Sequence, residues 1–210
     1  MSSDLRERKR LALRERLSDL ATALFLERGF DHVTVDDIAA AADVGRKTVF
    51  NHFPRKEDLF FDRDGEIRTV LRDVLQEGER PPAPIEAYRL LAHRLVAERS
   101  PYVAFSAQSR RFVETVEASP TLTARARELA SEIAHSLALA LAEWAQVDEA
   151  DPDAHLAAHL LVTTWTVARM HGHRVYLATN SAKKAHAAFL RMVDQGSAGV
   201  QAAVAGTLYT

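Results

Sequence analysis

The chain has 210 residues, a formal net charge of −2, 47% hydrophobic residues and no cysteine. This length suits a small domain followed by a medium one, with enough apolar side chains for a packed core. Without cysteine, disulfides, thiolate metal sites and thiol redox sensing are excluded. The charged N-terminus is unlike a signal peptide, and no apolar run approaches the ~18 residues of a membrane span. We therefore expect a cytoplasmic protein that does not contact membranes.

Residues 8–28 predict a first helix. Leu13, Leu17, Leu20 and Leu24 recur at intervals of three and four residues, which places them on one apolar stripe. Gly29 follows at a position typical of a left-handed helix stop. The helix is expected to form one wall of a small N-terminal domain.

Residues 34–59 predict two short helices joined by a tight turn. Thr34 can cap the first helix together with Asp37, three residues later, in a capping box. The run at residues 43–45 breaks the helix, and the second helix begins at Arg46. Pro54 ends it, because a helix interior does not tolerate proline. The spacing predicts a helix-turn-helix.

The second of these helices has a polar, basic outer face. Val49 and Phe53 are expected to point inward, and no acidic residue occurs between residues 44 and 56. A short helix with cations, amides and hydroxyls outward suits the DNA major groove. Asp36 and Asp37 are expected to face away from the DNA, whereas basic residues of the N-terminal arm are expected to be sorted towards it. These arm residues are Arg6, Arg8, Lys9, Arg10, Arg14 and Arg16.

The motif resembles the N-terminal signature of the TetR family of transcriptional regulators. The matching residues are Val35, Ile38–Ala39, Ala42, Val44, Thr48, Phe50, His52–Phe53, Lys56 and Leu59. The resemblance implies an all-α fold of about nine helices. Residues 1–55 would form a three-helix, helix-turn-helix DNA-binding domain, and residues 56–210 an effector-binding and dimerisation domain. It further implies a homodimeric repressor that a small molecule releases from a palindromic operator near its own gene.

The resemblance also assigns roles to single residues. Arg46, Lys47 and Asn51 fall at base-contacting positions, where Arg and Lys suit guanine and Asn suits adenine. Phe50 stands where tyrosine is common, so it would contact a thymine methyl instead of phosphate. Four residues match or suit phosphate-contacting positions: Thr34, Thr48, His52 and Lys56.

The remaining chain predicts further helices. A long connecting helix is expected after Pro54, and a capping residue followed by proline marks three later helix starts, at Ser100–Pro101, Ser119–Pro120 and Asp151–Pro152. Ser181 is expected to cap the last helix, with a frayed tail after Gly196. The two C-terminal helices are expected to pair with their copies as a four-helix bundle. The alternative is that their apolar faces only fill the monomer core.

Large side chains in the second half predict an effector pocket. Tyr102, Phe105, Trp144, Trp165 and Arg169 would line a site for an amphipathic small molecule, although ordinary core aromatics are the alternative. His155 and His159 lie one helical turn apart, but the spacing fixes no third ligand. We therefore expect no metal site and no cofactor, and an interface or surface role for this pair.

Two other functional classes remain as alternatives to a DNA-binding regulator. An enzyme on a helical bundle would need a catalytic constellation, and the sequence has no Gly-x-Ser-x-Gly elbow, phosphate-binding glycine loop or di-iron ExxH pair. A protein-interaction module with a non-functional helix-turn-helix is the other alternative. Salt-dependent binding to a short duplex would discriminate among the three classes.

Overall fold

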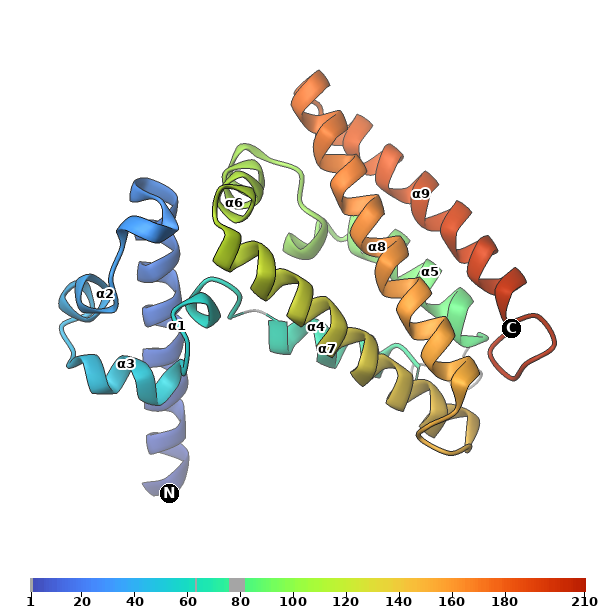
Figure 1. Ribbon diagram of the computed structural model, residues 1–210, viewed down its shortest axis with the longest axis horizontal. Helices are drawn as coiled ribbons and strands as arrows, with labels where there is room; N and C mark the ends of the chain where they lie inside the picture. The colour runs from blue at the N-terminus through green and yellow to red at the C-terminus, as the bar shows by residue number, and fades with distance from the viewer. Residues whose placement is uncertain (1, 63, 76–81) are drawn as a thin grey trace. The chain divides into compact units, whose positions relative to one another are not determined.

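The computed structural model describes residues 2–62, 64–75 and 82–210, with side chains from residue 6 onward except those of residues 64–68. Within these ranges it contains nine α-helices, three short 3-10 helices and no strand, which confirms the expected all-α class (Figure 1). Backbone contacts divide the chain into two compact units. The N-terminal unit comprises Met1–Asp64 and Arg111–Ala126, and the C-terminal unit comprises Gly65–Arg110 and Arg127–Thr210. No helix in the described ranges is long and apolar enough to cross a membrane.

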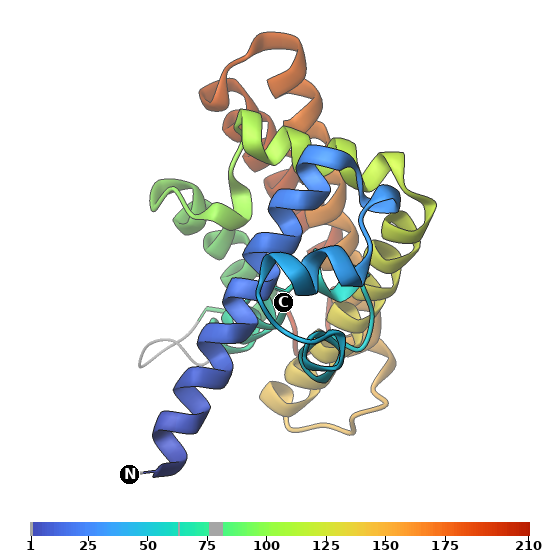
Figure 2. The same ribbon diagram turned by 90° about the vertical axis from the view of Figure 1, so that its left-hand side faces the viewer.

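The N-terminal unit is built around the long helix α1 (Ser2–Arg28), which begins earlier than the expected residue 8. The helix α2 crosses α1, and α3 follows it after a tight turn (Figure 2). Leu17, Phe25 and Ile38 are fully buried between these helices. The other elements of this part of the chain are η1 (Phe30–His32), α2 (Val35–Ala41), α3 (Arg46–His52) and η2 (Glu57–Leu59).

Residues 111–126 complete the core of the N-terminal unit. Phe112 stacks on Phe60 with ring centroids 4.3 Å apart, and Leu122 is fully buried in the same cluster. The Arg125 guanidinium lies 3.0 Å from a carboxylate oxygen of Asp58. The boundaries of the compact units therefore differ from the expected boundary at residue 55. The division into functional domains 1–55 and 56–210 stays a proposal.

The C-terminal unit has its core between α5, α8 and α9. The helices α8 and α9 lie side by side along most of their length (Figure 1). Close approach of this pair depends on Gly196, where a Cβ atom would lie 2.3 Å from Cγ2 of Thr164. The elements that contribute to this unit are α4 (Asp64–Asp73), α5 (Pro84–Ala97), η3 (Pro101–Val103), α6 (Ala107–Ala118), α7 (Pro120–Ala145), α8 (Pro152–Thr179) and α9 (Ala182–Ala203).

Two of the expected helices differ in the structure. The segment after Pro54 forms only the 3-10 helix η2, and α4 begins at Asp64, so one long connecting helix from Pro54 is wrong. Leu59 and Phe60 are buried in the core of the N-terminal unit, so this segment packs there and does not continue as one helix into α4. Similarly, Ser100–Pro101 starts only the 3-10 helix η3, and its Ser100 hydroxyl accepts a hydrogen bond from the Tyr102 amide at 3.4 Å.

The tail after Gly196 is ordered, so the expectation of fraying there is wrong. The helix α9 continues to Ala203, and Val200, Val204 and Tyr209 are buried. The Tyr209 hydroxyl donates a 2.8 Å hydrogen bond to Asp151, whose carboxylate also accepts from the Ala154 amide at the start of α8. The C-terminus is thus fastened to the N-terminus of α8.

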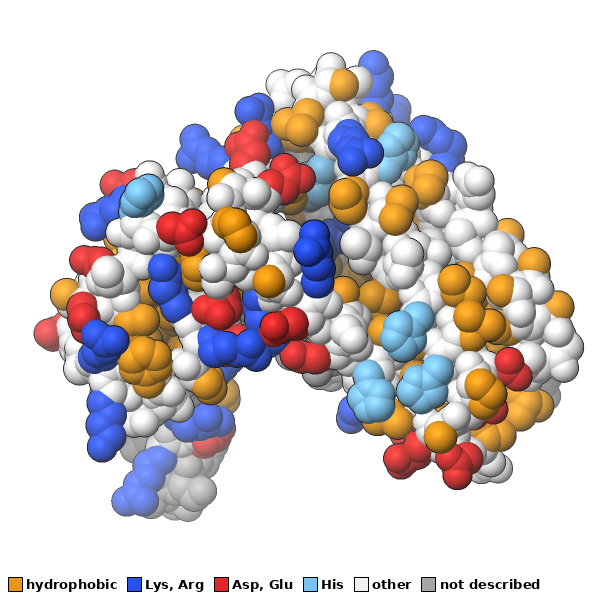
Figure 3. Space-filling view, in the orientation of Figure 1, with side chains coloured by type: hydrophobic (Ala, Val, Ile, Leu, Met, Phe, Trp, Pro, Cys, Tyr) orange, Lys and Arg blue, Asp and Glu red, His pale blue; other side chains and the backbone are white. Residues whose placement is uncertain are grey.

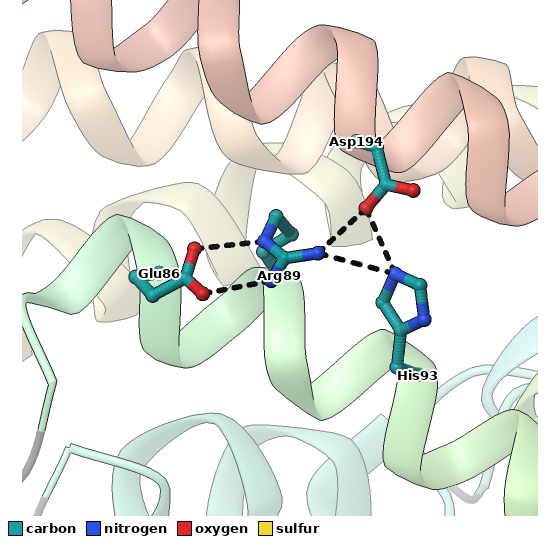
Figure 4. Close-up of polar contacts among 4 residues, drawn as sticks. All are labelled: Glu86, Arg89, His93 and Asp194. Atoms are coloured by element: carbon teal, nitrogen blue, oxygen red, sulfur yellow. Dashed lines mark hydrogen bonds and ion pairs between the residues drawn. The ribbon is translucent and has the colours of Figure 1, made fainter.

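A polar cluster links α5 to α9 in the C-terminal unit (Figure 4). Arg89 makes two 2.7 Å hydrogen bonds to the carboxylate of Glu86, one turn earlier in α5, and a 2.9 Å bond to Asp194 of α9. The ring of His93 lies 2.8 Å from the same Asp194 oxygen. Burial raises the pKa of Asp194, but the hydrogen bonds to His93 and Arg89 together outweigh it and leave the pKa below its ordinary value. The cluster holds the two helices together through charged hydrogen bonds.

Candidate functional site

The first helix of the helix-turn-helix has the predicted capping box. The Thr34 hydroxyl accepts a 3.1 Å hydrogen bond from the Asp37 amide, and the Asp37 carboxylate accepts a 2.8 Å bond from the Thr34 amide. The Thr34 hydroxyl also donates to this carboxylate at 2.6 Å. These bonds lower the pKa of Asp37. Both Thr34 donors are therefore engaged with Asp37, and a phosphate contact by Thr34 requires that it exchange one of these bonds.

The turn between α2 and α3 is fixed by local backbone geometry. Asp43 takes a left-handed conformation with φ of 53°, which Asp tolerates better than most residues. The Val44 amide donates to the Ala39 carbonyl at 3.0 Å. Gly45 then caps α3 without a side-chain hydrogen bond. The turn sends the chain directly into α3, where Val49 and the C-cap residue Phe53 are buried as predicted.

The outer face of α3 carries the residues that were predicted to contact DNA. Arg46, Lys47, Phe50 and Asn51 are exposed, whereas the other two predicted α3 residues, Thr48 and His52, are half-buried. Lys and Arg side chains surround exposed apolar atoms over this part of the unit (Figure 3). A convex, basic helix face of this kind fits the width of the major groove.

One acidic residue lies on the same surface as these cations. A carboxylate oxygen of Asp36, in the first turn of α2, is 2.8 Å from Nη1 of Arg46. Both side chains are more than half exposed. The expectation that Asp36 faces away from the DNA stays a prediction, although its carboxylate lies beside a residue that is predicted to contact DNA. The turn brings the N-termini of α2 and α3 close together, which spacing along the chain did not reveal. Arg46 thus has a carboxylate partner when no DNA is present.

Arg14 holds the other end of α3. Its guanidinium donates a 2.6 Å hydrogen bond to the His52 carbonyl, pairs with Asp62 at 2.5 Å and lies 4.2 Å from the centroid of the Phe53 ring. A cation at a helix C-terminus satisfies an unpaired carbonyl and complements the helix dipole. Arg14 was expected to face DNA with the other cations of the arm. In the structure its guanidinium contacts residues of the N-terminal unit, so Arg14 positions the end of α3.

Lys56 is also engaged within the N-terminal unit. Its ammonium donates a 2.7 Å hydrogen bond to the Phe30 carbonyl and lies 4.0 Å from the centroid of the Phe30 ring. Burial lowers the pKa of Lys56, and the nearby charges of Asp31 and Glu57 partly offset that effect. The residue therefore ties the segment after α3 to η1, which follows α1. A phosphate contact by Lys56 has to coexist with these bonds.

His52, the last residue of α3, has a buried ring nitrogen, Nδ1, without a hydrogen-bond partner among the described residues. Burial, followed by the charges of Arg10 and Arg14, lowers the pKa of His52. The imidazole is thus neutral at pH 7 and does not add to the positive charge of the helix. Its predicted phosphate contact would depend on the second ring nitrogen.

The predicted effector residues lie along the C-terminal unit. Phe105 is buried, with its ring centroid 5.0 Å from that of His173, and its ring fills the space beside Gly172. Trp165 is half-buried and packs edge-on against Phe189, whose ring is 6.1 Å from Phe105. Phe105 and Trp165 therefore belong to one aromatic cluster between α8, α9 and the segment before α6.

The other three candidates are more peripheral. Tyr102 and Trp144 are half-buried against the core, and Arg169 is exposed on α8. Burial, followed by the charge of Arg169, lowers the pKa of His173 to about 4. A cavity of about 10 Å³, enough for one water, lies against other residues: Leu71, Arg72, Ile133, Ser136, Leu137 and Ala140.

Three histidines gather on the surface over α7 and α8 (Figure 3). The ring of His155 is 5.9 Å from that of His135 and 6.3 Å from that of His159. One nitrogen of His155 contacts the Glu149 carbonyl at 3.1 Å, and one of His159 contacts the His155 carbonyl at 2.8 Å. Among the described residues, no group of three or more potential ligands is arranged to hold a metal ion.

The helix-turn-helix sequence is similar to that of known regulators. The family described as bacterial regulatory proteins, tetR family, matches residues 17–62. The regulator TcmR of Streptomyces glaucescens is 44% identical over 55 residues, which cover 26% of this chain and 24% of TcmR. The repressor DhaR of Mycobacterium sp. (strain GP1) is 32% identical over 80 residues, or 35% of this chain and 39% of DhaR. The chain thus matches well under half the length of these relatives.

Solved structures share the fold over nearly the whole chain. A SmeT–triclosan complex has a TM-score of 0.55 at 17% identity and covers 90% of this chain and 91% of that one. The fold is also similar to that of Salmonella enterica GusR, with a TM-score of 0.53 at 20% identity, covering 91% and 95% of the two chains. Residues 17–62 carry the sequence similarity to the family, and the solved structures show that the fold is shared beyond this segment. The helix-turn-helix of residues 17–62 therefore matches the TetR family of bacterial regulatory proteins.

Proposed function

We propose that the protein is a homodimeric, sequence-specific DNA-binding transcriptional repressor. A small molecule would release it from a palindromic operator near its own gene. The observation that carries this proposal is the outer face of α3, where Arg46, Lys47 and Asn51 are exposed on a helix anchored by Val49 and Phe53. DhaR and TcmR, which share the motif, are named a transcriptional repressor and regulator. Such a function places the protein in the cytoplasm, with the chromosome.

DNA contacts are proposed in two groups. Arg46, Lys47 and Asn51 would read base edges, because these side chains offer the donors and acceptors that guanine and adenine complement. Phe50 would add an apolar contact. Thr34, Thr48, His52 and Lys56 would contact phosphates, which position the helix without reading sequence. Thr34 would have to exchange a donor bond to Asp37 for one to phosphate, whereas Lys56 keeps ammonium protons that its bond to the Phe30 carbonyl does not use.

A dimer through α8 and α9 is supported by the exposed surface of α8. Leu156, Val167, Met170 and Leu177 are exposed to between 44% and 53%. Their spacings of 11, 3 and 7 residues keep them near one face of the helix. An exposed apolar stripe that runs along a 28-residue helix is typical of a helix–helix interface. We propose that a second copy of the chain covers this stripe, with α9 completing a four-helix bundle.

The dimer proposal has a direct test. Leu177→Glu should yield monomers in sedimentation velocity, because a carboxylate would be buried in the interface. Leu208→Glu is the matched control, since Leu208 is 59% exposed but lies outside α8. If both variants sediment as the unsubstituted protein does, the α8 stripe is not the interface.

The effector site is proposed around Tyr102, Phe105, Trp144, Trp165 and Arg169. The aromatic cluster of Phe105 and Trp165 offers flat apolar surface, and the Arg169 guanidinium would orient a polar group. The cavity of about 10 Å³ lies elsewhere, so a ligand would have to displace side chains of this cluster. SmeT, which shares the fold, was solved as a complex with triclosan.

Release by the effector would act on the distance between the two recognition helices. They must lie about 34–36 Å apart to enter successive major grooves. The boundaries between the two compact units fall within α6, within α7 and at the start of α4, so each of these helices contains residues of both units. We propose that a ligand bound in the C-terminal unit shifts these elements and so misplaces α3.

The experiment for the proposed function is binding to duplex fragments from the region upstream of the gene. A regulator should prefer one fragment over random DNA by at least about 10³-fold, with affinity that falls steeply as salt is raised. An interaction module or a helical enzyme would show no fragment preference at moderate ionic strength. That result would refute the proposal.

A further inference from the structure

Phe50 is an exposed aromatic side chain on an otherwise polar helix face. Its ring is 40% exposed, and in the described part of the N-terminal unit Leu11 is the other large hydrophobic residue with comparable exposure. The neighbouring positions on this face carry Arg46, Lys47 and Asn51, which suit DNA. An apolar ring at the centre of this face needs an apolar group on the DNA.

Phe50 and Arg46 form one structural pair. They lie four residues apart in α3, and the Arg46 guanidinium carbon is 5.5 Å from the centroid of the Phe50 ring. Side chains at this spacing lie on the same helix face. The pair therefore presents a forked cation and an apolar ring side by side on the exposed surface.

Only one group in the major groove matches an apolar ring in this way. Thymine carries a C5 methyl there, and guanine offers the O6 and N7 acceptors that Arg can bind with two hydrogen bonds. Successive bases on one strand are stacked about 3.4 Å apart, which is within the span of the two side-chain ends. Building on the function proposed above, we infer that Arg46 and Phe50 together read a guanine next to a thymine on one strand of each operator half-site.

Asp36 gives the pair a resting partner. In the free protein its carboxylate lies 2.8 Å from Nη1 of Arg46, with both side chains about 60% exposed. Exposed ion pairs of this kind contribute little to stability, so guanine can replace the carboxylate at low cost.

The test uses an operator selected from a random duplex library. Each thymine next to a guanine is replaced in turn by deoxyuridine, which removes only the methyl group. At one position in each half-site, binding should weaken about fourfold, the effect expected for one buried methyl. Phe50→Ala should bind the thymine and deoxyuridine operators equally, whereas Phe50→Leu should keep part of the preference.

Lys47→Ala is the matched control from the same helix face. It should bind more weakly but keep the same ratio between the thymine and deoxyuridine operators. If every deoxyuridine duplex binds the unsubstituted protein as well as the thymine duplex, the inference is wrong, although the proposed function stands. If the selection returns no preferred sequence at all, both fail.

Discussion

The Arg14 side chain of α1 donates a 2.6 Å hydrogen bond to the main-chain carbonyl of His52, the last residue of the recognition helix α3. The two residues are 38 positions apart in the sequence. The same guanidinium pairs with Asp62, just before α4. Arg14 therefore fixes the end of α3 both to α1 and to the segment around Asp62.

Replacing Arg14 should weaken DNA binding without changing sequence preference. Arg14→Ala would leave the His52 carbonyl and Asp62 without their charged partner, which is expected to lower the free energy of unfolding by about 1.5–3 kcal/mol. Operator and random duplexes should lose affinity together, because α3 is less well held. Urea unfolding and fluorescence anisotropy measure the two effects. Arg28→Ala, at an exposed position on the same helix outside the predicted DNA-facing arm, should change neither; a loss confined to the operator would mean that Arg14 reads bases.

Asn51 is predicted to discriminate between bases. Asn51→Ala should cost about 1–3 kcal/mol on the operator, because a bidentate contact to adenine is lost. Binding to random DNA should stay nearly unchanged. Competition anisotropy with the two duplexes measures the difference, and an equal loss on both would contradict the base-reading role.

Gly172 is required by the close packing of Phe105. A Cβ at residue 172 would lie 2.4 Å from Cζ of Phe105, so the ring must move. Gly172→Ala is expected to destabilise the protein by about 1–3 kcal/mol through overpacking. The matched control is Gly199→Ala in α9, where no atom lies within 4 Å of the added Cβ. This control should stabilise by about 0.5–1 kcal/mol, because alanine favours helix over glycine.

The interaction between Gly172 and Phe105 can be separated from a general helix effect. Adding Phe105→Leu to Gly172→Ala should relieve the clash, so the double variant should be more stable than the sum of the single losses predicts. Thermal unfolding of the four proteins gives the coupling. If the losses in stability are additive, Phe105 is not the residue that prevents a larger side chain at position 172.

His173 predicts a loss of stability in acid. Burial, with a smaller contribution from Arg169, lowers its pKa to about 4 from the ordinary 6.5. Between these values the unfolded chain binds a proton that the folded chain does not, so stability falls as pH decreases. The contribution of neutral His173 to the free energy of unfolding is fully present above about pH 6.5 and is lost by about pH 4. It amounts to at most about 3 kcal/mol.

His173→Gln tests this assignment. Urea unfolding at several pH values between 4 and 7 should show a shallower pH dependence in the variant than in the unsubstituted protein. A residual slope of the same sign is expected from His52, whose pKa is also lowered by burial. Identical slopes in both proteins would mean that His173 is protonated as easily in the folded state as in the unfolded state.

The C-terminal tail is predicted to contribute to stability. Tyr209→Phe removes the 2.8 Å hydrogen bond to Asp151 while it keeps the buried ring, and should cost about 1 kcal/mol. Leu208→Ala, at a neighbouring position that is 59% exposed, should change the free energy of unfolding by less than about 0.5 kcal/mol. Equal melting temperatures for Tyr209→Phe and the unsubstituted protein would contradict a fastened tail.

Local patterns were sufficient for the helix-turn-helix and for several helix starts. The capping box of Thr34, the stop before Pro54 and the caps of Asp151 and Ser181 all depend on residues within a few positions of each other. Because such bonds form within one turn, spacing along the chain predicts them. The family resemblance carried by residues 34–59 was confirmed for the same reason.

Contacts between distant segments were not predictable from spacing. The buried Leu59 and Phe60 interrupt the connecting helix because Phe112 stacks on Phe60. The tail beyond Gly196 is ordered because Tyr209 bonds to Asp151, 58 residues earlier. In each case a favourable long-range contact overrides what the local composition predicts.

The sequence alone determined the all-α class, the helix-turn-helix and the residues on the outer face of α3, because helical periodicity and capping are local properties. Only the tertiary structure decided what the cations do. It joins Arg14 to the end of α3, Lys56 to Phe30 and Arg46 to Asp36. A charge contacts DNA or stabilises the fold according to which partners the folded chain brings within about 3 Å, and no local pattern encodes that distance.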